Sequence, residues 1–230
     1  MRRALRLLKW GLAALVLLVL GYQLWVFGHL LWWTRFDPSE TRFMSLRLSE
    51  LRERRPDAEL RWQWVPYERI SVHLKRAVIA AEDDGFIDHE GFDWDSIQKA
   101  MEKNRKRGRS VVGGSTISQQ LAKNLFLSPS RSYVRKGQEA IITFMMEAVM
   151  DKRRILEIYL NVVEWGDGVF GAEAAAQHYY RIPAVKLGPD QAARLAVMLP
   201  NPRKYEKQFG PRLAAHASRI AGRMHRSQVP

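Results

Sequence analysis

The stretch GGSTISQQLAKN, residues 113–124, carries the clearest local fold signal in the chain. Thr116 and Gln119 fit the capping-box pattern, in which a hydroxyl and an amide side chain satisfy free N–H groups at a helix start. Gln119 and Lys123 are four residues apart and share one face of that helix. The preceding glycines leave N–H groups and the positive helix dipole open to an anion. The stretch therefore predicts a phosphate-handling helix over 116–127, with a merely well-capped helix as the open alternative.

Helical periodicity continues on both sides of this stretch. Upstream it predicts helices over 70–82, ending near Gly85, and over 94–103. A basic run at 103–109, followed by Gly113 and Gly114, indicates a mobile loop. Because strand-like alternation is scarce, the predicted fold class is mainly α. The downstream helices, separated by Pro, Gly or Ser, are predicted over 135–149, 153–163, 171–180 and 189–199.

The amino terminus predicts one membrane-spanning helix over 10–33. This run contains no Asp, Glu, Lys or Arg, and about 20 apolar residues span the hydrocarbon core. It exceeds the roughly 7–15 apolar residues of a cleavable signal peptide, and a buried core helix of this length rarely lacks every charge. Trp25, Trp32 and Trp33 form an aromatic belt at its far end. Cations at positions 2, 3, 6 and 9 predict a cytoplasmic tail over 1–9, with the rest of the chain outside.

Composition limits what the remainder can be. After the span is subtracted, the 230-residue chain has room for one substantial core, so we expect a juxtamembrane segment over 34–66 and one domain over 67–230. Cysteine is absent, and packing alone must hold that domain together. The net charge of +13 favours an anionic partner, such as nucleic acid, lipid headgroups or a phosphorylated substrate. An extracytoplasmic location argues against nucleic acid.

A run of carboxylates ends the helix predicted over 70–82. Glu82, Asp83 and Asp84 follow its apolar face and precede Phe86 and His89. Burial beside like charges raises a carboxyl pKa and suits the group to proton transfer. A solvated helix end is the alternative from this segment alone.

A second charged group begins the helix predicted over 135–149. Arg131, Arg135 and Lys136 precede Glu139, which could orient a cation or bind a sugar hydroxyl. An exposed ion-pair network is the alternative. The apolar residues of 152–161 recur at helical spacing, and we assign that block mainly to the core.

Five motifs in order resemble one family. They read EDxxFxxHxG at 82–91, GxSTIxQQxxKN at 113–124, RKxxE at 135–139, KxxILExYLNxxxxG at 152–166, and a fifth at 171–182. This pattern resembles the glycosyltransferase domain shared by class A penicillin-binding proteins and monofunctional peptidoglycan transglycosylases, glycosyltransferase family 51. The resemblance covers about residues 60–205 and implies a lysozyme-like helical fold. The fifth motif departs from the family, because Tyr180 replaces the usual Phe and Ile182 stands, beside Arg181, where a Lys is common.

The resemblance implies an inverting sugar transfer. The donor is a growing glycan on a polyprenyl diphosphate, and the acceptor is the GlcNAc 4-hydroxyl of lipid II. Glu82 maps to the general base, and Glu139 is the second predicted catalytic residue, with support of the cationic cluster as its other role. No cofactor is required, no residue is assigned to a metal, and Mg²⁺ or Mn²⁺ is optional. The predicted substrate-binding residues are Asp83, Phe86, His89, Ser115, Thr116, Gln119, Gln120, Lys123, Asn124, Arg131, Arg135 and Lys136.

The implied location is the inner membrane, with a single pass, a cytoplasmic amino terminus and a periplasmic catalytic domain. The implied partners are lipid II, the growing lipid-linked glycan and the membrane, with cell-wall synthesis or division proteins as further candidates. Phe126, Leu127 and Tyr133 are expected to contact lipid. Nucleic acid is not an expected partner.

Three other functions compete with this prediction. A lytic muramidase would also suit a lysozyme-like fold with Glu82 as an acid, but a glycosidase needs a second carboxyl to protonate its leaving group. A basic surface-binding module would account for the charge alone. We do not expect a bifunctional penicillin-binding protein, because the SxxK at Ser96–Lys99 lacks its partner motifs and few residues follow Tyr205.

Overall fold

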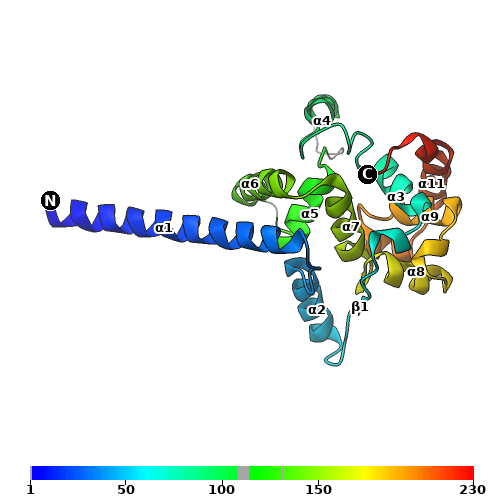
Figure 1. The fold of residues 1–230 in the computed structure, drawn as a ribbon, viewed down its shortest axis with the longest axis horizontal. Coiled ribbons are helices and arrows are strands. Elements are labelled where there is room, and N and C mark those ends of the chain that lie inside the picture. The colour runs from blue at the N-terminus through cyan, green and yellow to red at the C-terminus, as the bar shows by residue number, and fades with distance from the viewer. Residues whose placement is uncertain (1, 108–113, 131) are drawn as a thin grey trace.

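The computed structural model of the chain describes residues 2–107, 114–130 and 132–230. A helical body carries one long projecting helix, α1 (Arg2–Trp33) (Figure 1). The predictions of a mainly α fold and of a long apolar amino-terminal helix are confirmed. The helices of the body are α2 (Arg42–Arg54), α3 (Val72–Glu82), α4 (Trp94–Arg107), α5 (Ile117–Phe126), α6 (Tyr133–Val149), α7 (Lys152–Val162), α8 (Ala172–Tyr180), α9 (Pro189–Ala196), α10 (Pro202–Lys207) and α11 (Pro211–Arg223), with short 3₁₀ turns at Tyr67–Arg69, Ala184–Lys186 and Met224–Arg226.

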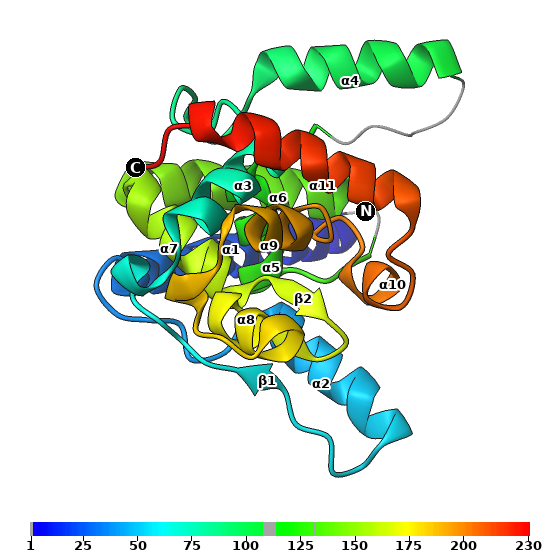
Figure 2. The same ribbon diagram turned by 90° about the vertical axis from the view of Figure 1, so that its right-hand side faces the viewer.

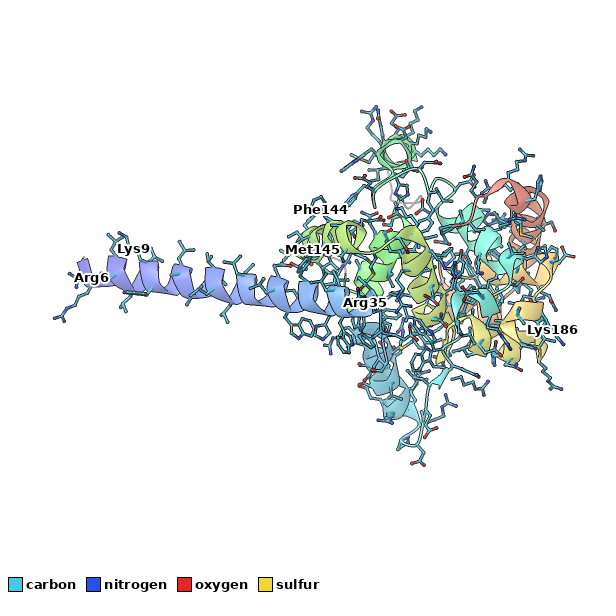
Figure 3. All side chains as sticks on the ribbon, viewed as in Figure 1. Arg6, Lys9, Arg35, Phe144, Met145 and Lys186 are labelled. Carbon is cyan, nitrogen blue, oxygen red and sulfur yellow. The ribbon has the colours of Figure 1, made fainter. Side chains whose placement is uncertain are left out.

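Most of α1 stands clear of the body. Its segment Leu5–Trp33 has a mean hydropathy of 1.9 over its most apolar window and is long enough to cross a membrane. Only the last third is docked, where Val26 and Leu30 are fully buried. The helix begins at Arg2, so the basic residues 2–9 of the predicted cytoplasmic tail are part of it (Figure 3). Its length, apolar composition and exposure are consistent with a single-pass membrane anchor.

The segment 34–66 is more than the expected link between span and domain. It contains α2, whose start is capped by Thr41 Oγ1, which accepts a hydrogen bond from Met44 N at 3.2 Å. Met44 and Leu51 are buried, and α2 packs against α5. The many charges of 42–54 masked this apolar face, which becomes visible only once α5 lies against it.

The predicted helices are present, with ends displaced by a few residues at most places. The main difference is α4, which runs to Arg107 and not to Lys103. Long basic side chains favour helix, so the first part of the basic run continues α4. The rest of the predicted mobile loop, 108–113, lies outside the described residues. The sequence interpretation did not identify α10 and α11.

A small sheet joins distant parts of the chain. Its strands are β1 (Arg61–Trp62), β2 (Glu164–Gly166) and β3 (Val169–Phe170), in the order β1-β3-β2. β1 pairs with β3 in parallel, and β2 with β3 antiparallel. The strand β2 starts with Glu164 and so brings that residue next to the body's central helices.

Helix α5 lies at the centre of the body. Its residues Ile117, Leu121 and Leu125 are four apart and buried, and the helix packs against α2, α6 and α7. The helices α3, α9 and α11 pack on one another beside it, whereas α2 and α4 lie on opposite sides of the body (Figure 2). The polar face of α5 is therefore held rigidly against the end of α3.

Candidate active site

Glu82, the last residue of α3, meets the polar face of α5. Gln120 Nε2 donates a hydrogen bond of 2.8 Å to Glu82 Oε2. The hydroxyl of Tyr159 on α7 in turn donates to Gln120 Oε1 at 2.9 Å, which fixes the orientation of the amide. Burial raises the pKa of Tyr159, so its hydroxyl keeps the proton that it donates. Side chains from three helices thus form a chain of two hydrogen bonds that ends at this carboxyl group.

The environment of Glu82 favours its protonated form. Burial is the largest influence on its pKa and raises it, and the neighbouring Asp83 raises it further. The hydrogen bond from Gln120 and the charge of Lys123 act in the opposite direction, and the net shift is upward. A carboxylate whose proton affinity is raised in this way is a better general base than one in water.

Asp83 is buried, and both of its carboxyl oxygens contact other groups of the protein. Its Oδ2 accepts a 2.9 Å bond from Ile117 N, the first residue of α5, and its Oδ1 lies 2.9 Å from His89 Nε2. Gly91 N donates to His89 Nδ1 at 3.1 Å, so His89 carries its proton on Nε2 and donates it to Asp83. Asp83 and His89 therefore lock α5 onto α3, and their predicted contact with substrate stays a prediction.

The start of α5 is closed by its cap. Thr116 Oγ1 accepts from Gln119 N at 3.2 Å, and Gln119 Oε1 accepts from Thr116 N at 3.1 Å, which is the predicted capping box. Together with the bond from Ile117 N to Asp83, this occupies N–H groups that we had expected to be open to an anion. At Ile117 N the expectation of a bound phosphate is wrong, because Asp83 of the protein already binds there. For the rest of the helix start it stays a prediction.

Cations gather instead along α5 and the start of α6. Lys136 Nζ lies 3.1 Å from Ser115 Oγ and pairs with Glu139 Oε1. Arg135 Nη1 donates to Glu139 Oε2 at 2.5 Å. Both oxygens of the buried Glu139 are thus held by cations, which fits support of the cationic cluster better than proton transfer. Its predicted catalytic role stays untested.

Lys123 is close enough to Glu82 and Glu139 for the charge of each to act on it. Burial lowers its pKa, the charges of Glu139 and Glu82 raise it, and those of Arg135 and Lys136 lower it. Its charge therefore interacts with both ends of the site, and a second anion entering there would be stabilised by a cation of low hydration.

Phe86, Asn124 and the residues of the fifth motif are mainly packed within the body. Phe86 is fully buried, with Lys152 Nζ 4.8 Å above its ring. Asn124 is buried on α5. Arg131 lies outside the described residues. The fifth motif supports packing, since Ile182 packs against the core and the hydroxyls of Tyr179 and Tyr180 donate to Trp165 O and Gln191 O at 2.8 and 3.4 Å.

Two cavities flank the Glu82–Gln120 pair. One, of about 200 Å³, is lined by Glu82, Asp84, Ser115 and Arg223 among others. The other, of about 160 Å³, is lined by Gln120, Lys123 and Glu164 among others. Glu82 therefore borders a cavity rich in carboxylates, and Gln120 borders one with more basic residues.

Comparison with known proteins identifies the family. The chain matches the family described as transglycosylase over residues 49–225. A biosynthetic peptidoglycan transglycosylase of Aromatoleum aromaticum is 68% identical over 230 residues, covering 100% of both chains. Proteins of the same description from Azoarcus sp. and Dechloromonas aromatica are 69% identical over 219 residues (95% of this chain, 94% of theirs) and 61% identical over 226 residues (98% of each). The chain belongs to the transglycosylase family.

Membership confirms the predicted peptidoglycan glycosyltransferase. In this transglycosylase the matched region begins inside α2 and ends in the last 3₁₀ turn, so it includes Glu82 and both flanking cavities. The lytic muramidase and the surface-binding module find no support in these relatives.

Some residues of the transglycosylase site were missed from the sequence. Tyr159 had been assigned to the core, and Glu164 and Glu147 had not been singled out. Glu147 accepts bonds from Ser118 Oγ at 2.5 Å and Lys152 Nζ at 2.8 Å, and so ties α5, α6 and α7 together. Of these three residues, Tyr159 alone had a local signal in the sequence, since its hydroxyl is a polar group within an apolar helical block.

Proposed function

We propose that the chain polymerises lipid II into glycan strands by inverting transfer. The acceptor's GlcNAc 4-hydroxyl attacks the anomeric carbon of the donor's MurNAc, a new glycosidic bond forms, and the bond to the polyprenyl diphosphate breaks. The hydroxyl proton passes to Glu82, and the diphosphate leaves with the bonding electrons. The observation that carries this proposal is Glu82, a partly buried carboxyl with a raised pKa, held by Gln120 between two cavities.

The proton transfer needs one carboxylate. A sugar hydroxyl is a weak nucleophile at neutral pH, and a base held within hydrogen-bond distance typically contributes about 10²–10⁴-fold. Glu82 Oε1 is not engaged by Gln120, whose bond is to Oε2. We assign Oε1 to the acceptor hydroxyl.

The departing diphosphate needs positive charge and not an acid. Diphosphate is already a good leaving group, in contrast to the alkoxide of a glycosidase. Lys123, Lys136 and the hydroxyl of Ser115 supply cationic and hydrogen-bonding groups near Glu82. Glu139 holds Lys136 and Arg135 in place, so the cluster is arranged before substrate enters.

The long helix suits a substrate that is itself held in the bilayer. We propose that α1 crosses the inner membrane with Arg6 and Lys9 on the cytoplasmic side and the body in the periplasm (Figure 3). Tethering raises the concentration of the enzyme at its lipid-linked substrate without any further contact.

The transfer is proposed to require no resident cofactor. The residues that would meet the diphosphate are a lysine pair and a serine, which replace the charge of a metal ion. Polymerisation by wild type should therefore persist, within about threefold, after chelation with EDTA, because the cations of the protein remain. Loss of product on chelation, restored by Mg²⁺ or Mn²⁺, would contradict this proposal.

The test of the function is polymerisation of lipid II by wild type, Glu82→Gln and Asp84→Asn. Glutamine keeps the shape of Glu82 but cannot take a proton, so glycan product should fall about 10²–10⁴-fold. Asp84 is the matched control, because it binds Arg223 and Ser227 at the outer side of the same cavity. Release of soluble fragments from mature glycan without polymer formation would overturn the proposal.

A further inference from the structure

Glu164 is a buried carboxyl with one free oxygen. It begins β2 and is 5% exposed. Its Oε2 accepts a bond of 3.2 Å from Arg47 Nε on α2. Its Oε1 has no hydrogen-bond partner in the described part of the chain. A buried oxygen without a partner is uncommon in a folded protein and points to a group that is absent here.

The free oxygen belongs to the cavity next to the catalytic pair. Glu164 lines the cavity of about 160 Å³ together with Gln120, Lys123 and Asn124 of α5, and with Phe43 and Asn201. Gln120 is shared, because its amide nitrogen binds Glu82 while its side chain also borders this cavity. Whatever fills the cavity is therefore one amide side chain away from the reacting centre.

Apart from Lys123, which the proposed function assigns to the departing diphosphate, the lining favours a sugar over a second phosphate. Arg47 and Arg203 also border the cavity, but both pair with Glu50, at 2.5 and 3.3 Å. Amides, a free carboxyl oxygen and an aromatic ring are the groups that bind hydroxyls, N–H groups and the C–H face of a pyranose. The volume is comparable to one such ring.

We propose that Glu164 is a binding residue of a sugar subsite, where its free carboxyl oxygen accepts a hydrogen bond from a hydroxyl or acetamido N–H of an N-acetylated sugar of the glycan. The subsite rests on the proposed function, and adds to it a specificity contact on the side of Gln120 away from the acidic cavity. Arg47 positions Glu164 but does not saturate it.

Protonation of Glu164 should modulate this contact. Burial raises its pKa to about 7, against the opposing charges of Arg47 and Arg203 and with the help of Asp167. Lys123 is the remaining charged group that faces the cavity. The ionised carboxylate accepts a stronger hydrogen bond than the neutral acid, so affinity for the sugar should rise as the pH rises through about 7.

The test is equilibrium binding of a soluble GlcNAc–MurNAc disaccharide-peptide to the full-length protein in detergent, with no turnover involved. Glu164→Ala should weaken binding about tenfold, the effect of losing one hydrogen bond to a charged group. Glu53→Gln is the control, because Glu53 is exposed on the same helix as Arg47 and does not line the cavity, and its affinity should stay within about twofold of wild type.

The pH dependence provides a second measurement if Glu164→Ala does not fold. Glu164→Gln keeps the size of the side chain but does not titrate, so its affinity should be flat between pH 6 and 8, where wild type gains. The inference would be overturned if Glu164→Ala bound with wild-type affinity, or if Glu53→Gln lost as much affinity as Glu164→Ala. Equal pH profiles of wild type and Glu164→Gln, or no binding by wild type, would also overturn it. If wild type polymerises lipid II while these outcomes occur, the subsite fails and the proposed function stands.

Discussion

Glu82 and Glu139, the two residues predicted from the sequence to be catalytic, differ in their surroundings. Glu139 has both oxygens engaged by Arg135 and Lys136, whereas Glu82 has one oxygen on the neutral amide of Gln120. An ion-paired carboxylate is a poor proton acceptor, and one that is buried against an amide is a better one. We therefore propose Glu82 as the base and Glu139 as the residue that holds the cations.

This difference predicts the pH dependence of turnover. The base works only when ionised, and the raised pKa of Glu82 means that activity falls with acidification earlier than for an ordinary carboxyl. Since the hydrogen bond from Gln120 lowers that pKa, Gln120→Leu should move the acid limb of kcat to higher pH. The measurement is the pH profile of lipid II polymerisation at saturating substrate. The exposed Gln98→Leu is the control, and an acid limb that does not move in Gln120→Leu would disprove the link.

The sequence patterns predicted which residues belong to the site, but they did not predict which of these residues contact one another. Glu82, Gln120 and Lys123 were all singled out, since the motifs name them. Their relation to Tyr159 and Glu164 was missed, because the residues that approach α5 come from segments about forty positions away in the chain. No local period encodes such a contact.

At the scale of the elements, the cap of α5 links stability to catalysis. Thr116 Oγ1 accepts from Gln119 N and also donates to Gly91 O at 2.7 Å, so the helix start is tied to the loop after α3. Gly91 has φ +86 and approaches Thr143 so closely that a Cβ would lie 2.8 Å from its Cγ2. The angle at which α5 presents Gln120 to Glu82 is therefore set at these few residues.

Thr116→Ala should lower both stability and turnover. Loss of a cap costs about 1 kcal/mol, and release of the α5 start should move Gln120 relative to Glu82 and reduce kcat severalfold. Thr41→Ala is the matched control, because Thr41 is a buried cap of α2 away from the catalytic pair. Thermal unfolding and steady-state polymerisation measure the two effects. Full kcat in Thr116→Ala, at a stability loss equal to that of Thr41→Ala, would separate the cap from catalysis.

Helix positions were predictable where period and cap are local, as for α5 and α7. The helices α2 and α11 were not, for different reasons. In α2 the apolar residues are interspersed with arginines, and their burial depends on α5. In α11, Pro211 at the first turn and buried residues at 217 and 220 were available signals, but they lie beyond the motifs on which the interpretation concentrated.

At the scale of the whole molecule, the apolar helix and the catalytic body form a continuous unit. The docked end of α1 packs against α6, and Phe144 and Met145 on α6 lie toward the side from which α1 projects (Figure 3). Tyr133, Val134 and Phe144 leave most of their side chains exposed on α6. This arrangement, which joins residues more than a hundred positions apart, could not be read from the sequence. If α1 is the membrane anchor that we propose, this packing sets the height of the active site above the bilayer.

A pair of amides at this junction provides the last prediction. Gln23 Nε2 donates to Gln138 Oε1 at 2.8 Å, and Gln138 Nε2 donates back to Gln23 Oε1 at 3.1 Å. Either Gln23→Leu or Gln138→Leu leaves one amide unpaired in an apolar setting, and should lower stability in detergent by about 0.6–1.7 kcal/mol. The double variant should recover part of the loss, because no unpaired amide remains.

The single variants should also raise the apparent KM for lipid II in vesicles more than they lower kcat, since the body is no longer held at a fixed height. Leu24→Ala, on the exposed side of α1, is the control. Strictly additive losses in the double variant would mean that the two amides act independently and do not hold the body on its anchor.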